Sequence, residues 1–188
     1  MLIILEGLDN SGKNTIVTRL CQRHSSYIKI DFPDYSSNIG KLIKEELTQG
    51  SLAPLPLQLL FSCERLSKKQ LVVDWSSHHA LITTRYSYST IAYGTARGIS
   101  ESLLRELEAE MPTPDLKIFL DITPRESIRR SQERDIFESD YTLLRHVHDI
   151  YQHIIHEEND WVVINAMQPI EVVEKQVEQA IFLLLDKP

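Results

Sequence analysis

A short apolar run that ends in a glycine-rich turn constrains the fold of this chain more than any other feature of its sequence. Residues 2–5 are continuously apolar, and Glu6 and a turn with two glycines, Gly7 and Gly12, follow at once. A continuous apolar run of this length is typical of a strand that is buried on both faces of a parallel sheet. A helix is predicted to follow over about 12–24. The order of strand, glycine turn and helix therefore predicts an α/β fold that opens on a phosphate-binding loop.

Similar apolar runs recur along the chain and predict the remaining strands of the sheet. They lie at 27–32, 80–83, 116–120 and 161–164. The segments between them have helical spacing, and helices are predicted over about 39–49, 57–75, 100–109, 139–157 and 170–185. This alternation predicts one doubly wound domain over residues 1–188, a three-layer sandwich of the P-loop NTPase type in which helices flank a five-stranded parallel sheet. Ligands of such a sheet bind at the carboxyl ends of its strands.

The composition limits the partners and the compartment to be expected. The 188 residues are enough for one sizeable core. The formal net charge of −7 argues against nucleic acid as the partner, although a local cluster of arginines would still suffice for a nucleotide. Cys21 and Cys63 have no short spacing, so neither a disulfide framework nor a cysteine zinc site is indicated. With no signal peptide and no run long enough to span a bilayer, we expect a soluble, cytoplasmic protein without a membrane partner.

The glycine-rich turn contains the residues that binding of a nucleoside triphosphate requires. Small residues let successive backbone N–H groups point at the phosphates, and the start of the helix adds positive potential. Lys13 offers a mobile ammonium to the β- and γ-phosphates. A Mg²⁺-binding hydroxyl is expected directly after this lysine, but the chain has Asn14, whose amide oxygen is usually a weaker ligand for a hard cation. The predicted ATP-binding residues of the turn are Gly7, Asp9, Asn10, Ser11, Gly12, Lys13, Asn14 and Thr15.

Further blocks follow the turn in a fixed order. The first half of the series consists of Leu5-Glu-Gly-Leu-Asp9, Asp31-Phe-Pro33 with Gly40, Leu59-Leu-Phe-Ser-Cys-Glu-Arg65 and Thr84-Arg-Tyr-Ser-Tyr-Ser-Thr-Ile-Ala-Tyr93. The second half consists of Arg129, Arg130, Arg134, Phe137-Glu138 and Trp161-Val-Val-Ile-Asn-Ala166. In these blocks and their order, nearly the whole chain resembles the thymidylate kinases, a family of nucleoside monophosphate kinases.

The resemblance implies that the protein passes a phosphoryl group from ATP, bound with Mg²⁺, to dTMP. In the family, the residue matching Asp9 faces the acceptor's sugar, that matching Phe61 stacks on thymine and that matching Arg65 reaches a base oxygen. Lys13 would hold the donor phosphates and Arg85 would bridge donor and acceptor, so both are predicted as catalytic. The predicted acceptor-binding residues are Asp9, Phe32, Pro33, Phe61, Arg65, Arg85, Ser89 and Tyr93.

The arginines of the later blocks match the lid of family members whose lids are basic. Over a lid of about 129–139, we predict Arg129 and Arg134 as catalytic and Arg130 as ATP-binding. Planar guanidinium groups suit phosphate well, and lid closure keeps out water that would otherwise accept the phosphoryl group. Members of the family pair through helices, so the resemblance also implies a homodimer.

Plain structural explanations compete with several of these assignments. Phe61 has helical spacing with Leu57, and such a residue would ordinarily belong to the core. The lid arginines stand among acidic residues, so a solvated, salt-bridged helix surface is an equal alternative. His146 and His153 lie on one helix face with Asp149 between them, which leaves a metal site open as well.

Three departures from the family pattern fall on the predicted reaction centre. Asn14 replaces the loop hydroxyl, Thr84 replaces an aspartate, and Tyr35 replaces an arginine that is common in eukaryotic-like members. Asn14 and Asp9 are the metal ligands that the sequence still offers. Three functions stay open: a slow dTMP kinase, a kinase for a different or modified nucleotide or nucleoside, or a nucleotide-binding module with little turnover.

Overall fold

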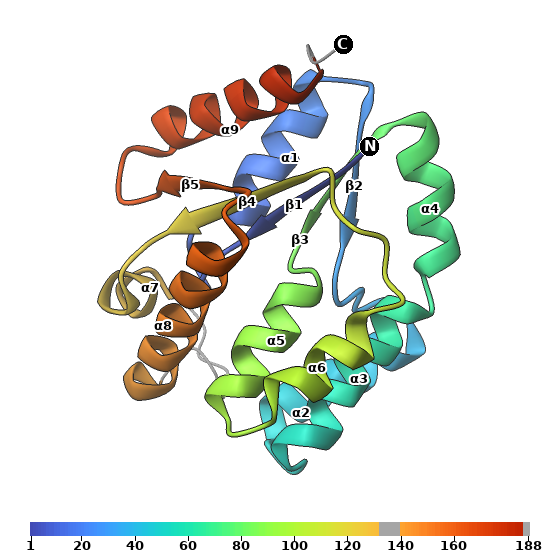
Figure 1. Cartoon of the computed structure of the whole chain (residues 1–188), viewed down its shortest axis with the longest axis vertical. Coiled ribbons are helices and arrows are strands. Elements are labelled where there is room, and N and C mark those ends of the chain that lie inside the picture. Colours follow the sequence, from blue (N-terminus) through green and yellow to red (C-terminus); the bar gives the residue numbers. More distant parts are fainter. Residues whose placement is uncertain (132–139, 186–188) are drawn as a thin grey trace.

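The computed structural model describes residues 1–131 and 140–185. At its centre is a sheet of five parallel strands in the order β2-β3-β1-β4-β5, drawn as arrows in Figure 1. The strands are β1 (Leu2–Glu6), β2 (Tyr27–Asp31), β3 (Ala80–Thr84), β4 (Leu116–Asp121) and β5 (Trp161–Asn165). The predicted α/β fold with five parallel strands is confirmed.

Helices cover both faces of the sheet, which explains why its first strand is apolar without alternation. Ile3 and Leu5 belong to the core cluster that contains residues of α1 (Lys13–Arg23) and α9 (Ile170–Leu185), the two helices across the upper part of Figure 1. Leu2 and Ile4 point to the other face and pack in a second cluster with Val72 of α4 (Lys69–His78). Successive side chains of a strand alternate between the faces, so both sets must be apolar.

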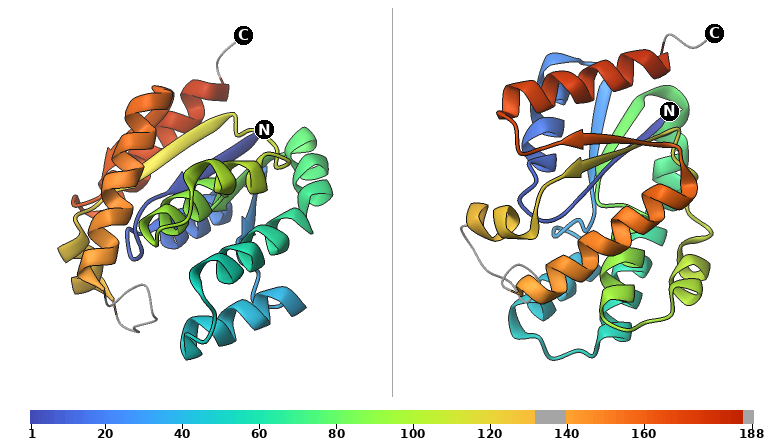
Figure 2. Two further views of the ribbon diagram at one scale, coloured as in Figure 1. Left: turned by 60° about the horizontal axis from the view of Figure 1, so that its bottom comes forward. Right: turned by 60° about the vertical axis from the view of Figure 1, so that its left-hand side comes forward.

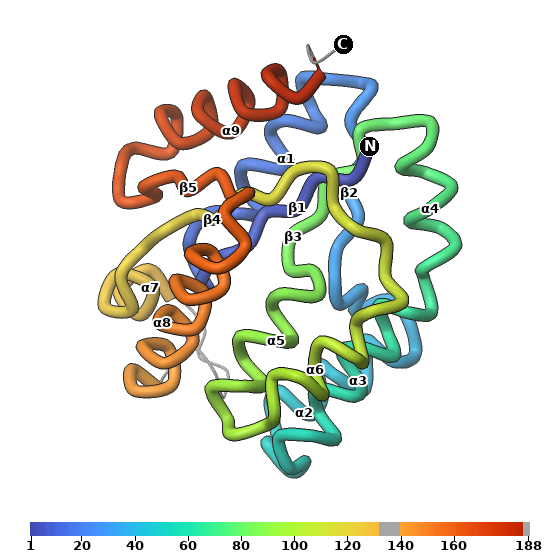
Figure 3. Tube along the Cα trace, in the orientation of Figure 1, coloured from blue at the N-terminus to red at the C-terminus, as the bar shows by residue number. Residues whose placement is uncertain are grey.

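The remaining helices lie beside and beyond the carboxyl ends of the strands. They are α2 (Asn38–Gln49), α3 (Pro54–Leu66), α5 (Ser87–Ala96), α6 (Glu101–Glu108), α7 (Pro124–Arg130) and α8 (Tyr141–Glu158). α5 contacts α8, α6 and α3, and α3 also contacts α2. The left view of Figure 2 shows α2 and α3 side by side, and the tube in Figure 3 shows the chain leaving β3 directly into α5. No helix in the described part of the chain is long and apolar enough to cross a membrane.

The single helix predicted over 57–75 is wrong, because the structure has α3 and α4 there. The break lies at Ser67 and Lys68, where the Ser67 hydroxyl donates to the Glu64 carbonyl oxygen at 2.7 Å. A serine side chain that bonds nearby backbone competes with the helical ladder. α3 also begins earlier than predicted, with Pro54 in its first turn, a position at which proline costs no hydrogen bond.

α7 was not among the predicted helices, although the sequence contains a signal for it. The Thr123 hydroxyl accepts a hydrogen bond from the Glu126 N–H at 3.2 Å, and Pro124 follows the cap. Threonine, proline and then glutamate three residues after the cap form a recognisable helix start. The helix is too short for an apolar periodicity to reveal it.

Candidate active site

Two glycines shape the turn between β1 and α1. Gly7 has a φ of +140° and Gly12, the N-cap of α1, a φ of +96°. A Cβ atom on Gly7 would lie 2.6 Å from the Leu120 carbonyl oxygen, so only glycine fits against β4. The turn therefore presses closely on the neighbouring strand, and its glycines allow the positive φ angles with which such turns bind phosphate.

The Lys13 ammonium is held over this turn by its own backbone. Its Nζ donates to the carbonyl oxygens of Gly7 at 2.8 Å and Leu8 at 2.7 Å, and to Ser11 Oγ at 3.1 Å. The lysine side chain is almost wholly buried. These three bonds use all three donors of the ammonium and keep it beside the turn, and a phosphate that arrives there would take over one or more of them.

The other predicted residues of the turn lie around this lysine. Asn10 adopts a left-handed conformation with a φ of +60°, and its amide nitrogen donates to the Ser127 carbonyl oxygen of α7 at 3.3 Å. The Ser127 hydroxyl in turn donates to the Asp9 carbonyl oxygen at 2.7 Å. Asn14 and Thr15 are exposed in the first turn of α1. α7 is thus fastened to the turn on the side opposite to β3.

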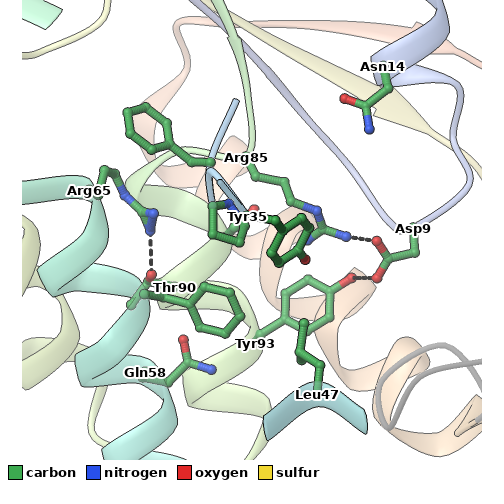
Figure 4. A pocket seen from close by; sticks show the side chains of 13 residues that line it. Asp9, Asn14, Tyr35, Leu47, Gln58, Arg65, Arg85, Thr90 and Tyr93 are labelled. Carbon is green, nitrogen blue, oxygen red and sulfur yellow. Dashed lines mark hydrogen bonds and ion pairs between the residues drawn. The ribbon is translucent and has the colours of Figure 1, made fainter. Parts of the chain in front are cut away.

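A cavity of about 220 Å³ opens next to the turn and contains every predicted acceptor residue. Figure 4 shows the side chains that line it. Those predicted from the sequence are Asp9, Phe32, Pro33, Phe61, Arg65, Arg85, Ser89 and Tyr93. The turn after β2, the helices α3 and α5 and the phosphate-binding turn each contribute to this list. Phe61 is half-buried in the cavity wall, so its ring is available to a ligand rather than enclosed in the core.

Arg85 lies between the phosphate-binding turn and the cavity. It has a left-handed backbone with a φ of +62°, and its guanidinium forms an ion pair with Asp9. The Tyr93 hydroxyl donates to the second oxygen of Asp9 at 2.8 Å, and the Arg85 guanidinium lies 5.5 Å from the centre of the Tyr93 ring. Figure 4 shows the three side chains converging. Each Asp9 oxygen thus has one partner, and a carboxylate oxygen has a second lone pair, so these contacts leave a metal ligand role for Asp9 open.

Ser89 reaches a buried carboxylate, that of Glu6, beneath the cavity. The Ser89 and Tyr151 hydroxyls donate to one oxygen of Glu6 at 2.7 and 2.8 Å, and the Tyr86 N–H donates to the other at 2.6 Å. Burial, and then the negative charge of Glu6, raise the pKa of Tyr151 well above its ordinary value. A fully buried carboxylate needs such donors. The signal for it was a glutamate directly after the apolar residues of β1.

Arg65 is held on the cavity wall by a second buried acid. Its Nε donates to Glu108 at 3.2 Å and its Nη2 donates to Thr90 at 2.6 Å. The Ser62 hydroxyl donates to the same Glu108 carboxylate at 2.6 Å. The arginine predicted to reach a base oxygen thus has its guanidinium plane set by partners on α5 and α6. No local pattern marked Glu108, because it lies 43 residues from Arg65.

Removal of the Glu108 carboxylate is expected to affect both the stability of the protein and the binding of the acceptor. Glu108→Ala should lower the free energy of unfolding by about 3 kcal/mol or more, since it leaves a buried guanidinium without its charged partner. It should also raise KM for the acceptor, because Arg65 loses its fixed orientation. Urea unfolding and steady-state kinetics measure the two effects. The matched control is Glu110→Ala, which removes a fully exposed partner of Lys69 and should change neither quantity. Equal stability of Glu108→Ala and the parent protein would contradict the assignment.

The turn after β2 carries Phe32, Pro33 and Tyr35 into the cavity and is tied down by Asp34. The Asp34 carboxylate accepts hydrogen bonds from Lys68 at 2.8 Å and from the N–H and hydroxyl of Ser36 at 2.9 and 2.6 Å. The Lys68 and Ser36 hydrogen bonds hold the pKa of Asp34 well below its ordinary value.

This depressed pKa predicts a pH dependence of stability. A carboxyl group with a lower pKa in the folded state stabilises the protein above its unfolded pKa of about 4, and the contribution is lost as the pH falls through the folded pKa. Urea midpoints of the parent should therefore fall between pH 6 and pH 3 more than those of Asp34→Asn. Lys68→Met should flatten the same slope, because the Lys68 bond is the largest cause of the shift. Equal slopes in parent and Asp34→Asn would refute the prediction.

The predicted lid residues are only partly within the described residues. Arg134, Phe137 and Glu138 lie outside them. The exposed Arg129 binds Glu126 at 2.6 Å, and Arg130 binds the same carboxylate at 2.6 Å. These two bonds lower the pKa of Glu126 to about 2. The salt-bridged helix surface that the sequence left open is therefore present at α7.

Arg130 has further contacts that tie it to the nucleotide side of the site. Its Nη2 donates to the Ala166 carbonyl oxygen at 3.0 Å, and its Nη1 donates to the Asn10 carbonyl oxygen at 3.5 Å. The arginine thus connects α7, the loop after β5 and the phosphate-binding turn. The ATP-binding role predicted for Arg130 agrees with this position, while Arg129 points away with 72% of its side chain exposed.

The histidines of α8 do not form a metal site in the described part of the chain, where no three His, Cys, Asp or Glu side chains stand close enough to hold an ion. His148 is bonded to Asp121 at 2.8 Å, and His153 lies 3.3 Å from Glu157. His146 is exposed. These contacts are ordinary polar pairs on the surface of a helix.

Several cavity residues had not been predicted. Gln58 is 1% exposed, and its Nε2 has no hydrogen-bond partner among the described residues. It lies one turn before Phe61 and two turns before Arg65, so helical spacing would have pointed to it. The other additions are Leu47 and Thr90, while Asn14, predicted to bind ATP and metal, and Tyr35, predicted to fall on the reaction centre, also line the cavity.

Comparison with known proteins agrees with this geometry. A sequence model of the family described as Thymidylate kinase matches residues 5–177. The thymidylate kinase of Arabidopsis thaliana is 32% identical over 187 residues, which cover 96% of this chain and 70% of that protein. The thymidylate kinase of Caenorhabditis elegans is 32% identical over 192 residues, covering 94% of this chain and 88% of that protein. A solved structure of thymidylate kinase from Candida albicans superposes with a TM-score of 0.82 at 29% identity, covering 97% of this chain and 91% of that one. The chain belongs to the thymidylate kinase family.

Proposed function

We propose that this protein transfers the γ-phosphoryl group of ATP to dTMP and so forms dTDP. The observation that carries the proposal is the cavity beside the phosphate-binding turn, in which all eight residues predicted to bind the acceptor meet. Membership of the thymidylate kinase family supports the same reaction.

The described residues divide the work between donor and acceptor. Backbone N–H groups of the turn and the Lys13 ammonium hold the donor phosphates. Phe61 offers a ring face for the acceptor base, while Tyr93 and Asp9 lie where the sugar would enter. Arg85 contacts Asp9 of the turn and also lines the cavity, so its guanidinium can neutralise charge on both phosphates. Such a reaction depends on alignment and charge neutralisation rather than on a covalent intermediate with the protein.

The oxygen atoms beside the turn fit a nucleotide-bound Mg²⁺. Asn14 Oδ1 is a hard oxygen of the kind that Mg²⁺ prefers, and the Thr84 hydroxyl donates to it at 2.8 Å. Mg²⁺ usually takes one or two protein ligands in addition to phosphate oxygens and water, so a full protein cage is not required. When bound with ATP, the ion supplies positive charge against the β- and γ-phosphates.

A coupled assay with dTMP, dUMP, dCMP, dAMP and dGMP as acceptors tests the proposal. We expect the highest kcat/KM with dTMP, because the cavity presents Phe61, Arg65, Ser89 and Tyr93 together. Absence of turnover with all five would refute the kinase assignment and leave the protein as a nucleotide-binding module.

A second candidate is a kinase for a nucleoside or for a modified pyrimidine nucleotide. Tyr35 favours it, since this side chain lines the cavity at the position where eucaryotic-like family members commonly have an arginine. A phenol cannot neutralise the charge of an acceptor phosphate as a guanidinium does. Competition of free nucleosides with dTMP in the same assay distinguishes the candidates, because nucleosides would inhibit strongly only in the second case.

Assembly and location are further parts of the proposal. Leu55 and Leu59 of α3 and Leu103 of α6 are exposed, and α3 contacts α6. Such an apolar helix surface supports a homodimer, which light scattering after gel filtration would detect as twice the chain mass. Both cysteines are free, in keeping with the reducing cytoplasm.

A further inference from the structure

Asn14 and Thr84, two departures from the family pattern, are bonded to each other. Thr84 is the last residue of β3 and pairs in register with Leu5 of β1, so it ends beside the phosphate-binding turn. Asn14 is the second residue of α1. The Thr84 hydroxyl donates to the Asn14 amide oxygen at 2.8 Å, across 70 positions of sequence. Two changes that look independent in the sequence therefore share one hydrogen bond.

The two residues differ in their access to a ligand. Thr84 is 3% exposed. Asn14 is exposed and lines the cavity, and in Figure 4 it lies where the cavity borders the phosphate-binding turn. A buried hydroxyl needs a partner, so its bond to the amide restrains the Asn14 side chain from beneath. The amide oxygen has two lone pairs, and this bond uses only one of them. The second lone pair is not used by this bond, and the residue that carries it lines the cavity.

Compared with the usual P-loop arrangement, this pair has its donor on the strand and its acceptor on the helix. In P-loop proteins the residue after the lysine supplies a hydroxyl, and an aspartate from another segment completes the metal shell. Here the hydroxyl of Thr84 stands on the strand and the acceptor oxygen of Asn14 stands on the helix, so one donor and one acceptor are kept while the negative charge is lost. Either change alone would disturb the arrangement. A serine oxygen at 14 is one bond closer to the backbone than the amide oxygen and would lie farther from the Thr84 hydroxyl, and a carboxylate at 84 would attract the NH₂ side of the amide.

We propose that Asn14 and Thr84 act as one unit that presents a neutral oxygen to nucleotide-bound Mg²⁺, with Thr84 as the positioning residue. The inference deepens the proposed kinase function and rests on it. An oriented amide oxygen meets the demand for one protein ligand beside phosphates and water. Because the pair is uncharged, the nucleotide must supply the negative charge. The site therefore binds a divalent cation together with nucleotide and not alone.

A double-mutant cycle with a metal-binding readout tests the coupling. Mn²⁺ serves as the probe, and electron paramagnetic resonance measures its binding to the complex of protein and ADP. Thr84→Val keeps the branched shape but removes the donor, and should weaken Mn²⁺ binding by about threefold to tenfold, the loss expected for one hydrogen bond. It should leave ADP affinity in EDTA unchanged. In an Asn14→Ala background the same change should have no further effect. Equal losses in both backgrounds, or an equal loss of ADP affinity without metal, would overturn the inference.

A second experiment restores the residue types that P-loop proteins usually have at these two positions. Asn14→Ser combined with Thr84→Asp should bind Mn²⁺ with ADP at least as tightly as the parent, and each single change should bind it more weakly. Single variants that match or exceed the double variant would argue against the unit. Thr83→Val is the control, because its side chain lies on the opposite face of β3 and should leave Mn²⁺ affinity unchanged.

The two proposals fail in different ways. A parent protein that phosphorylates none of the five nucleotides, yet shows the Mn²⁺ coupling with ADP, would refute the kinase assignment and support the unit. An active parent with additive effects at positions 14 and 84 would refute the unit alone.

Discussion

Lys13→Met is expected to lower kcat for phosphoryl transfer by about 10²- to 10³-fold, the loss typical of removing one positioned electrostatic contact. Methionine keeps the length of the side chain and removes its charge and donors. In the structure the turn holds the ammonium through the carbonyl oxygens of Gly7 and Leu8 and through Ser11 Oγ, so phosphate oxygens would replace one or more of these acceptors. Steady-state kinetics with saturating ATP and dTMP measure the effect.

The control for Lys13→Met is Lys44→Met. Lys44 is exposed on α2, so its loss removes one surface charge and should leave kcat within about twofold. ADP binding should also weaken in Lys13→Met, because the lysine contacts the phosphates in the ground state as well as in the transition state. A kcat within tenfold of the parent would mean that the turn does not hold the transferring phosphate in the assigned way.

Arg85→Gln is expected to have the second largest effect, a fall in kcat of about 10²-fold or more. Within the described residues, the Arg85 guanidinium contacts the phosphate-binding turn through Asp9, and the same residue lines the acceptor cavity. Arg85→Lys should recover only part of the activity, because an ammonium is a point charge without the planar fork of arginine. KM for dTMP should rise in both variants, since Arg85 also faces the bound acceptor.

Arg145→Gln provides the comparison for Arg85. Arg145 is a largely exposed arginine of α8, 3.9 Å from Asp149. Its replacement should leave kcat and KM unchanged. If kcat or KM changed in this variant too, part of the effect of Arg85→Gln would come from the general loss of positive charge. If Arg85→Gln raised KM while kcat stayed the same, Arg85 would be an acceptor-binding residue that does not act on the transition state.

The backbone at Arg85 indicates that its position is imposed by the surrounding structure. A left-handed conformation is uncommon for a residue with a long side chain and costs about 1 kcal/mol or more. Its N–H donates to the Leu5 carbonyl oxygen at 3.3 Å, which anchors the residue to β1 at the same time as its side chain reaches Asp9. Strain of this kind persists where several contacts hold one geometry, and it is common at active sites.

Local patterns in the sequence accounted for the strands and the phosphate-binding turn. The inner strands β1, β3 and β4 are short apolar runs because they are buried between helices, and glycines mark the turn because its φ angles are positive. Four of the predicted strands end one residue too early, since polar residues such as Glu6, Thr84 and Asp121 continue the ladder beyond the apolar part, whereas the strand predicted over 27–32 ends one residue earlier, at Asp31. Polar residues at the carboxyl ends are the ones that face the site, so hydrophobicity alone stops too early.

The acceptor residues could be predicted because the family blocks occur in order, but their buried partners could not. Glu108 sets the orientation of Arg65, and Glu6 holds Ser89, yet neither acid belongs to a local motif with its partner. The break between α3 and α4 was also missed, because the bond of the Ser67 side chain to the backbone interrupts a continuous helical pattern.

The sequence by itself thus determined that a phosphate-binding turn opens an α/β fold with five parallel strands, since turn and strand signals are local. Only the tertiary structure decided that Asn14 and Thr84 form a pair. Their contact depends on β3 lying beside β1 in the strand order β2-β3-β1-β4-β5, which brings together residues 70 positions apart. The period of a helix or strand carries no information on which strands are neighbours, so a hydrogen bond between two of their ends is set by the packing of the whole sheet.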